Sequence, residues 1–439
     1  MRKQLLLALC ALLINPALAS EPAVTHDFTL DNGLRVLVRE DHRAPVAMQV
    51  LWYKVGSYDE PPGLTGISHV LEHMLFKGTE RLPAGEFSRL VARFGGNDNA
   101  FTHYDYTGYF QKFEVSRLPL MMEIEADRMR NTLIEEDEFA KELQVVLEER
   151  RQRTDDNPNG LAWERFAALT RPGSGYASPI IGWPTELDQL SAAQARDWYQ
   201  RFYHPANAVL VIVGAVTGAE VRTLAERFYG PIAAGEEYPR PTPGLADAPG
   251  ERRQVLRLPV QVPNLYMAWN VPTLITHPDD FYALTMLSGV FDGGMSARLE
   301  SKLVRGQELA ASAGAGYSGL SRADGLFTLS ATPKGGVTLA RLEGAIQALL
   351  DELRQQPPND AEMARVRAAV LAGQVFARDS IYMQAMELGQ LSVLDVDWRL
   401  ADQFDERLAA VSADDVRRAA ATWLVPERLT VAHILPEAQ

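Results

Sequence analysis

Apolar and polar residues near the start of the chain follow a pattern that predicts a β-hairpin and a further strand. Residues 28–30 and 34–38 are rich in apolar and β-branched residues and flank an Asp-Asn-Gly sequence at 31–33, a strong hairpin turn signal. The apolar stretch 46–53 adds another strand. The first half of the chain therefore begins with strands.

Two helices are predicted downstream of these strands. The first runs from about Gly66 to Lys77, with Thr65 as the expected N-cap and Gly78 as the stop. The second covers residues 138–153, where apolar and acidic positions recur at helical spacing. An apolar helix thus directly follows the hairpin strands.

The chain matches itself when Leu190 is laid on Val411 and the register is kept without a gap, which indicates a duplicated fold. Each copy is a Ser-capped amphipathic helix, a proline turn and a strand. In the second half, strands at 255–260 and 265–271 precede a helix at 280–291 that contains no histidine. The predicted fold class is α+β: two homologous α/β-sandwich domains, each a mostly antiparallel sheet covered by helices, with only the first equipped for a metal.

The length and the distribution of proline set the expected domain boundaries. A chain of 439 residues is longer than a chain that usually folds around a single hydrophobic core, so two domains are expected. Prolines gather between positions 234 and 250, where apolar residues are few, which is typical of an extended linker. We expect a signal peptide at 1–19, an N-terminal domain at 20–233, the linker at 234–250 and a C-terminal domain at 251–439.

The segment 1–19 has the pattern of a secretory signal. Arg2 and Lys3 precede an apolar run at 5–14, and Ala17 to Ala19 precede the expected cut. The run is too short to span a bilayer, and no later stretch is long enough. We therefore expect a mature protein without a stable membrane anchor, exported across the inner membrane and periplasmic in a double-membraned bacterium.

Cysteine usage restricts the chemistry that a metal site can use. The single cysteine, Cys10, lies inside the expected signal, and the preceding Ala8 and Leu9 do not give the small residue that lipoprotein processing needs just before the cysteine. A mature chain without cysteine has no disulfide and no thiolate ligand. Any metal site must therefore use His and carboxylate side chains.

The acidic charge excludes one class of partner and leaves two interpretations open. The formal net charge is −14 and no Lys/Arg cluster is present, which argues against nucleic acid binding. The acidity either aids solubility or reflects an acidic interior that attracts basic peptides.

The first predicted helix carries residues that suit a catalytic metal. His69 and His73 are separated by four positions, so both imidazoles project from one helix face, with Glu72 beside them. This spacing supplies two nitrogen ligands and a carboxylate that can take a proton from an attacking water. The competing interpretation is a surface helix that carries two of the eight histidines by chance.

The second predicted helix offers a third ligand. On one stripe, Glu142 and Glu149 flank Val145 and Val146; the opposite stripe holds Lys141, Gln144, Glu148 and Gln152. A carboxylate on an apolar stripe is costly to bury unless it meets a cation. The pattern favours Glu149 as the ligand and Glu142 as a partner that orients a ligand histidine, whereas Glu148 is solvated. A surface helix held by salt bridges is the alternative.

The residues resemble the pitrilysin/insulinase family of zinc metallopeptidases, the inverzincins. His69 and His73 match the family's histidine ligands, Glu72 its general base, Glu149 its glutamate ligand at the family's spacing after the second histidine, and Glu142 its accessory glutamate. The segments 182–183 and 203–208 are also similar, and the resemblance covers nearly the whole mature chain. It implies an endopeptidase with one Zn²⁺ per chain, of the short two-domain type found among bacterial and mitochondrial processing peptidases.

The resemblance also suggests where a peptide substrate binds. Asn99, Ala100, Phe101 and Thr102 match the family's edge strand, which pairs with extended peptide. Backbone hydrogen bonds then hold the peptide with little regard to its sequence. An ordinary edge strand is the alternative.

One family feature is incomplete in the second half. Relatives capable of full catalysis carry an Arg and, seven positions later, a Tyr; here Arg305 matches, but the seventh position after it is Ser312, and Tyr317 lies nearby at the wrong spacing. Because two-domain relatives pair two chains, we hypothesise a heterodimer with a sister chain of the same family. A homodimer that uses Arg305 and Tyr317 is the alternative.

Other functional classes receive less support. The Gly/Ser-rich run 311–321 lacks the Lys-Ser/Thr of a phosphate loop and is expected to be an ordinary loop beside strands or a flexible substrate-contacting loop. No G-x-S-x-G nucleophile elbow is present. The rival hypotheses are a non-catalytic structural or assembly subunit that retains the fold, and a hydrolase of non-peptide substrates.

Overall fold

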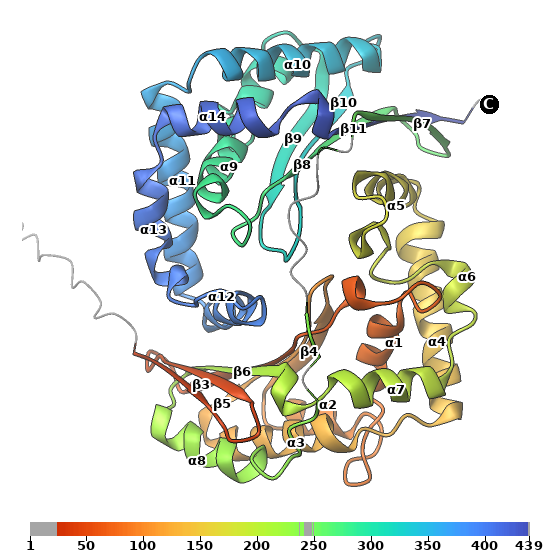
Figure 1. The fold of residues 1–439 in the computed structure, drawn as a ribbon, viewed down its shortest axis with the longest axis vertical. Coiled ribbons are helices and arrows are strands. Elements are labelled where there is room, and N and C mark those ends of the chain that lie inside the picture. The colour runs from red at the N-terminus through yellow and green to blue at the C-terminus, as the bar shows by residue number, and fades with distance from the viewer. Residues whose placement is uncertain (1–23, 237, 241–247, 249, 438–439) are drawn as a thin grey trace, which may run out of the picture.

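Two halves, each built on one sheet, make up the protein (Figure 1). The expected signal peptide with Cys10, and the linker positions 237, 241–247 and 249, lie outside the described residues. The computed structural model describes residues 24–236, 238–240, 248 and 250–437. Among the helices in these ranges, none has the length and hydropathy needed to cross a bilayer.

The N-terminal half contains a six-stranded sheet in the order β1-β2-β6-β3-β5-β4. Gly33 has a φ of 87° in the turn between the antiparallel strands β1 and β2, so the predicted hairpin is confirmed. β4 is an edge strand, paired only on the β5 side. The strands are β1 (Thr25–Thr29), β2 (Arg35–Glu40), β3 (Val46–Tyr53), β4 (Asn97–Thr102), β5 (Thr107–Glu114) and β6 (Ala208–Gly214).

Helices of the same half cover one face of this sheet. Because side chains alternate along a strand, Leu51 and Tyr53 of β3 enter a core with these helices, while Val50 and Trp52 point to the other face. The N-terminal half contains the helices α1 (Ile67–Met74), α2 (Glu86–Arg93), α3 (Leu118–Asn131), α4 (Glu136–Arg150), α5 (Pro158–Thr170), α6 (Pro184–Leu187), α7 (Ala192–Phe202) and α8 (Gly218–Phe228). Of these, α5 packs on the C-terminal sheet instead.

The C-terminal half repeats the plan with a five-stranded sheet in the order β7-β11-β8-β10-β9. Its strands are β7 (Arg252–Leu258), β8 (Asn264–Val271), β9 (Ala310–Ser318), β10 (Gly325–Pro333) and β11 (Leu429–Pro436). Its helices are α9 (Pro278–Phe291), α10 (Leu339–Gln355), α11 (Asp360–Arg378), α12 (Ile381–Val393), α13 (Leu400–Ala410) and α14 (Ala413–Trp423).

The structure repeats in the register in which the sequence matches itself. With the offset that aligns Leu190 with Val411, the first and last residues of α7 align with the first and last residues of α14. The first residue of β6 likewise aligns with the first residue of β11. β6 pairs parallel with β2 and antiparallel with β3, and β11 pairs parallel with β7 and antiparallel with β8. Apart from β1, the two sheets therefore have the same strand order and directions.

Each half lends one helix to the open face of the other half's sheet (Figure 1). Ala385 and Leu388 of α12 pack with Val50 and Trp52 of the N-terminal sheet. Phe166 of α5 packs with apolar residues of β7, β8, β10 and β11 in the C-terminal sheet. The two halves are thereby joined by apolar cores that neither half completes alone.

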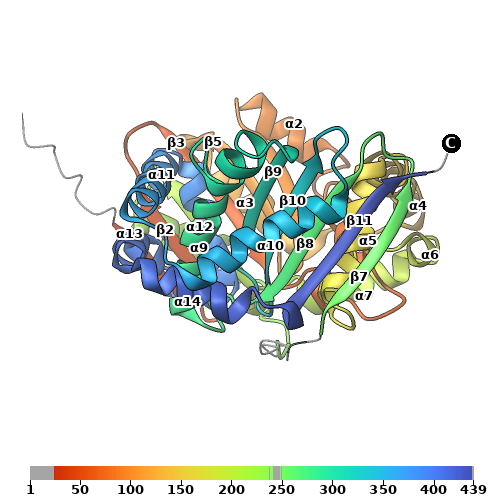
Figure 2. The same cartoon turned by 90° about the horizontal axis from the view of Figure 1, so that it is seen from above.

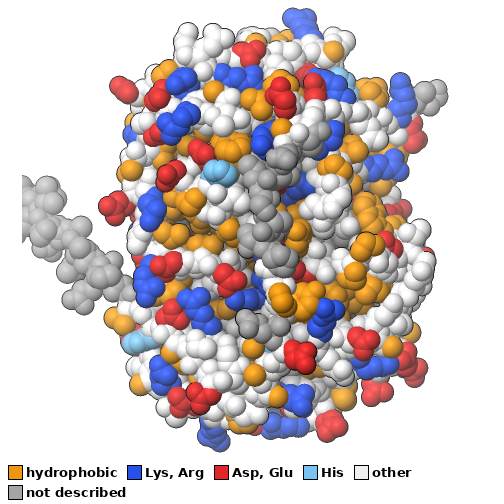
Figure 3. All heavy atoms as spheres, in the orientation of Figure 1, with side chains coloured by type: hydrophobic (Ala, Val, Ile, Leu, Met, Phe, Trp, Pro, Cys, Tyr) orange, Lys and Arg blue, Asp and Glu red, His pale blue; other side chains and the backbone are white. Residues whose placement is uncertain are grey.

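Buried charged groups also connect the two halves. Arg322, which follows β9, donates to Asp59 at 2.7 Å and to Asp105 at 2.8 Å, and Tyr176 also donates to Asp105 at 2.7 Å. Arg240, in the predicted linker segment, donates to the backbone carbonyl of Asp105. On the surface, charges of both signs are interspersed over the face drawn in Figure 3.

The Gly/Ser-rich run at 311–321 is not the predicted loop. Most of it forms β9, which pairs antiparallel with β10 from Ala310 to Ser318 with a bulge near its start. Its small residues carry little intrinsic strand preference, so the pairing with β10 decides its conformation. Figure 2 shows β9 beside β10 in the C-terminal sheet.

Candidate metal centre

The helix that carries the two histidines is shorter than predicted and begins differently. α1 spans Ile67–Met74, and its N-cap is Gly66 with a φ of 91°, so the prediction of Thr65 as the cap was wrong. The carboxylate of Glu60 accepts the N–H groups of Gly66 and Ser68, both at 2.8 Å, at the start of the helix. Gly78, the predicted stop, follows the helix with a φ of 99°.

The structure brings His69, His73 and Glu149 together. The imidazoles project from one face of α1 with ring centroids 5.0 Å apart. Nε2 of His69 and Nε2 of His73 lie 3.8 and 3.4 Å from Oε2 of Glu149, which comes from α4. One ligand atom from each residue lies within 4.8 Å of the others.

The donor set fits a zinc ion. Zinc bonds of about 2.0–2.2 Å in tetrahedral directions place neighbouring ligand atoms about 3.4 Å apart. The His–Glu distances of 3.4 and 3.8 Å are close to that value. Two imidazoles and one carboxylate are also the ligand types of catalytic zinc sites, which keep a further position for water or substrate.

Burial and charge prepare these side chains for a cation. Burial, with a smaller effect of His73, lowers the pKa of His69 to about 4, so its imidazole is neutral at pH 7 and able to bind a metal. A hydrogen bond with His73 lowers the pKa of Glu149, which keeps that side chain ionised. Arg153, an exposed residue one turn later, forms an ion pair with the other oxygen of Glu149.

Glu72 lies next to the candidate metal ligands and has a defined partner. The hydroxyl of Thr102, at the end of β4, donates to Oε2 of Glu72 at 2.6 Å. Burial raises the pKa of Glu72, and the bond from Thr102 opposes that rise. The side chain is therefore held in place by the edge strand, with a pKa moved toward the range that suits a general base near neutral pH.

Glu142 contacts the second histidine from the far side. Its Oε2 lies 3.2 Å from Nδ1 of His73, while its Oε1 forms an ion pair with Nζ of Lys77 at 2.5 Å. This contact leaves Nε2 of His73 directed at Glu149. The predicted orienting role of Glu142 has the required geometry.

The side chains of α4 that point inward and outward differ in part from the prediction. Glu142 and Val146 are buried, and Glu148, whose side chain is 44% exposed, accepts a hydrogen bond from Gln152, in line with the predicted facing of these three residues. Val145, predicted to face inward, is 47% exposed. The apolar stripe is thus narrower than predicted. The helix also ends at Arg150 rather than near 153 and continues as a π-helical turn, Arg151–Asp155.

The predicted substrate strand is β4, next to the candidate metal ligands. Thr102 reaches Glu72, so the alternate residue Phe101 points to the opposite face of the sheet, where its ring lies 5.0 Å from that of Trp52. Asn99 is exposed and Ala100 is partly exposed. A strand added to this edge would pass beside Glu72.

Arg305, Ser312 and Tyr317 lie in the C-terminal half. Arg305 is exposed, bonds the carbonyl of Met295 and pairs with Glu300. The hydroxyl of Tyr317 donates to the carbonyl of Pro272 at 2.6 Å, and burial raises the pKa of that phenol. Tyr317 is therefore committed to a structural contact.

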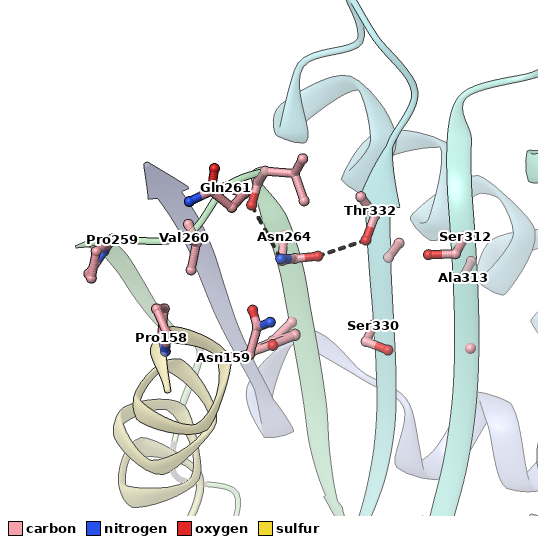
Figure 4. Close-up of a pocket in the computed structure, with 14 residues that line it drawn as sticks. Pro158, Asn159, Pro259, Val260, Gln261, Asn264, Ser312, Ala313, Ser330 and Thr332 are labelled. Atoms are coloured by element: carbon pink, nitrogen blue, oxygen red, sulfur yellow. Dashed lines mark hydrogen bonds between the residues drawn. The ribbon is translucent and has the colours of Figure 1, made fainter. Parts of the chain in front are cut away.

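Ser312 lines a cavity of 710 Å³ on the C-terminal sheet, and neither His69 nor His73 belongs to its lining. Figure 4 shows the side chain of Ser312 on β9 directed toward Thr332 on β10, whose hydroxyl donates to Asn264 at 2.7 Å, with Ser330 on the same strand as Thr332. Asn159, at the start of α5, forms part of the opposite wall. A serine at this place leaves room that a tyrosine ring would reduce.

Sequence reasoning missed several residues that organise the site. Thr102 was part of the substrate-strand motif but was not assigned to Glu72, and Glu60, Lys77 and Arg150 were not singled out. No local signal marks them, because each contact joins segments that are distant in sequence or depends on the turn before α1.

Comparisons with known proteins identify the family of the chain. Residues 35–182 match the family model for insulinase (peptidase family M16), and residues 189–370 match that for the peptidase M16 inactive domain. The chain is 33% identical over 343 residues to the zinc protease PqqE of Helicobacter pylori, covering 77% of each chain. It is 27% identical over 401 residues to an uncharacterized zinc protease of Streptomyces coelicolor, covering 89% of this chain and 85% of that one.

Solved structures show the same fold. A protease from Helicobacter pylori superposes with a TM-score of 0.89 at 29% identity, covering 94% of this chain and all of that one. The first half of the periplasmic protease PqqL from Escherichia coli superposes with a TM-score of 0.76 at 19% identity, covering 94% and 93% of the two chains, a likeness of fold alone. The chain therefore belongs to the pitrilysin/insulinase family, peptidase family M16.

Proposed function

We propose that the protein is a zinc-dependent endopeptidase that hydrolyses peptides or small unfolded proteins and holds one zinc ion per chain. The observation that carries this proposal is the convergence of His69, His73 and Glu149 within 4.8 Å, with Glu72 on the same helix as the histidines. An assembly subunit that only retained the fold would have no need for this donor set. Relatives that are named zinc proteases support the same interpretation.

The chain's own residues have distinct roles in this proposal. His69, His73 and Glu149 hold the ion, which when bound polarises the scissile carbonyl and makes a water more acidic. Glu72, held by Thr102 at 2.6 Å, takes the proton of the attacking water and passes it to the leaving amine. Glu142 orients His73 through its Nδ1.

The edge of β4 is the proposed binding place for the peptide backbone. Residues Asn99, Ala100 and Phe101 present backbone groups that β5 does not pair on their outer side. An extended peptide that adds to this edge gains main-chain hydrogen bonds with little sequence preference. The edge leads to Thr102, and so brings the peptide to Glu72.

We further propose that this chain is the zinc-bearing member of a dimer with a sister chain of the same family. Ser312 replaces the expected tyrosine, and the phenol of Tyr317 is bound to Pro272, which weakens the homodimer alternative. In the sister chain, an arginine like Arg305 and a tyrosine would complete the site. Activity of the chain alone that does not improve when the sister chain is added would contradict this.

The domain division and location belong to the same proposal. We propose a cleaved signal at 1–19, a zinc-binding domain at 20–233, a linker at 234–250 and a metal-free domain at 251–439, in a periplasmic protein. The neighbour of the same fold from Escherichia coli is a periplasmic protease, which supports the location. Sequencing the N-terminus of the protein from a periplasmic extract tests both the cut and the compartment.

Substitution of Glu72 tests the proposed activity. Glu72→Gln should retain one zinc per chain and lose peptide hydrolysis by at least about 100-fold, the usual contribution of a general base. Glu148→Gln, at an exposed position beside Glu149, is the matched control and should keep full activity. Metal-free protein at neutral pH in unchelated samples would favour the assembly subunit, and zinc without peptide cleavage would favour a non-peptide hydrolase.

A further inference from the structure

Arg150 follows the proposed ligand Glu149 directly and is 2% exposed. Its Nη1 and Nη2 donate to the two carboxylate oxygens of Glu164 on α5 at 2.8 and 2.9 Å. Nη1 also donates to the carbonyl of Gly182 at 2.9 Å, and Nη2 to Asp155 at 3.2 Å. One buried guanidinium thus connects the end of α4 with three other segments.

The contact at Gly182 reaches the helix of the histidines. Gly182 has a φ of 91°, and a Cβ atom added there would lie 2.5 Å from the carbonyl oxygen of Thr65. The hydroxyl of Thr65 accepts the N–H of Trp183 at 3.0 Å. The loop that Arg150 holds is therefore packed, backbone against backbone, on the turn that leads into α1.

The contact at Glu164 reaches the C-terminal half. Glu164 lies on α5, between Ala162 and Phe166, which pack against the C-terminal sheet. The side chain of Glu164 is only 10% exposed, so the pair is shielded from solvent. Arg150 therefore lies where α4, the loop before α6 and α5 meet.

We infer that Arg150, paired with Glu164, is a positioning residue that sets the distance between Glu149 on α4 and the two histidines on α1. This inference rests on the proposed zinc site. A buried ion pair is weak evidence for stability, because desolvation offsets most of the attraction. Its value here is geometric: the two-nitrogen fork fixes both the separation and the orientation of the groups it joins.

Zinc affinity tests the inference without any need for catalysis. The double variant Arg150→Met/Glu164→Gln removes both charges at similar volume and leaves all three proposed ligands in place. Loss of an outer partner of a metal ligand typically weakens binding about 10- to 100-fold. We expect its zinc dissociation constant, measured by competition with a chromophoric chelator, to rise at least about 10-fold, and the visible spectrum of the Co²⁺-substituted protein to change.

A matched pair elsewhere in the chain is the control. Arg298 donates to Glu362 through Nε at 2.7 Å and Nη2 at 3.0 Å, and these side chains are 7% and 17% exposed. Arg298→Met/Glu362→Gln should leave zinc affinity and the Co²⁺ spectrum as in the wild type. If both double variants weaken zinc binding equally, the effect is a general loss of stability and the inference is wrong.

Two further results complete the test. Wild-type affinity and an unchanged Co²⁺ spectrum in Arg150→Met/Glu164→Gln would overturn the positioning role. If that variant fails to fold, Arg150→Lys serves as the test, because lysine keeps the charge but lacks the two-nitrogen fork. A raised zinc dissociation constant in Arg150→Lys supports the inference, and an unchanged one overturns it. If the wild type itself binds no zinc, the proposed function fails, which is a separate outcome.

Discussion

Oε2 of Glu142 lies 3.2 Å from Nδ1 of His73, on the side of the ring opposite Glu149. This contact fixes which ring nitrogen is left for a cation, because Nδ1 is engaged by the carboxylate and only Nε2 points to Glu149 at 3.4 Å. The carboxylate of Glu142, which is not itself a proposed ligand, thus directs the lone pair of Nε2 of His73 toward the proposed metal position.

Removal of the Glu142 carboxylate should weaken zinc binding. Glu142→Gln is expected to raise the zinc dissociation constant about 10- to 100-fold, because the amide holds the imidazole less firmly. Chelator competition measures the change. Glu138→Gln, on the same helix at an exposed ion pair with Lys141, should bind zinc as the wild type does. Equal affinity of the two variants would show that Glu142 has no orienting role.

Thr102→Val should impair turnover without loss of metal. The substitution removes the bond of 2.6 Å to Glu72, and a hydrogen bond to a charged group contributes about 1.5–3 kcal/mol. We expect kcat to fall by about 10-fold or more while zinc content stays at the wild-type level. Thr223→Val, at an exposed position on α8, is the control. Lowered zinc content in Thr102→Val would mean that Thr102 supports the fold of the site rather than Glu72.

Gly389 of α12 should tolerate no side chain. A Cβ atom there would lie 2.0 Å from Nε1 of the buried Trp52, at the junction between the halves. Overpacking of this kind costs about 1–3 kcal/mol. Gly389→Ala should therefore lower the free energy of unfolding in urea by that amount. At Gly373, in α11, an added Cβ meets nothing within 4 Å, and Gly373→Ala should be neutral or slightly stabilising.

Glu387, on α12, should make stability fall as pH rises. Burial raises its pKa from 4.5 to about 7, among the nearby charges Arg39, Asp402, Arg378 and Asp405. A folded-state pKa above the unfolded one means that the folded state holds the proton more tightly, so this contribution is full below pH 4.5 and is lost as pH rises through 7. A shift of this size corresponds to at most about 3 kcal/mol.

Urea unfolding at pH 5 and pH 9 checks this prediction. Glu387→Gln, which carries no charge at either pH, should become more stable relative to the wild type as pH rises. If the difference in unfolding free energy between Glu387→Gln and the wild type does not change with pH, Glu387 does not cause the predicted loss of stability.

Glu343 should have the opposite effect on the pH dependence of stability. Burial disfavours its charged form, but the hydrogen bonds from Arg253 and His433 outweigh burial and lower its pKa. Glu343→Gln should lose stability at pH 9 and approach the wild type near pH 4.

The tertiary structure corrected those predictions that relied on local preference alone. Thr65 has the chemistry of an N-cap, but Gly66 takes the cap position in a left-handed conformation, and Glu60 binds the first N–H groups instead. Val145 lies on the predicted stripe but is exposed, because only part of that stripe meets α1 and its neighbours. The run at 311–321 is a strand because β10 pairs with it, which no residue within the run indicates.

The sequence by itself determined what depends on short spacing and on repetition. Helical geometry places His69 and His73 on one face, the Asp-Asn-Gly turn forms the hairpin, and the internal match of the chain indicates two halves of the same fold. The three-dimensional meeting of Glu149 with these histidines, and of Thr102 with Glu72, was decided by packing. So was the exchange of α5 and α12 between the halves. The physical reason is range: backbone periodicity acts over short stretches of chain, whereas burial of apolar faces selects contacts between distant segments.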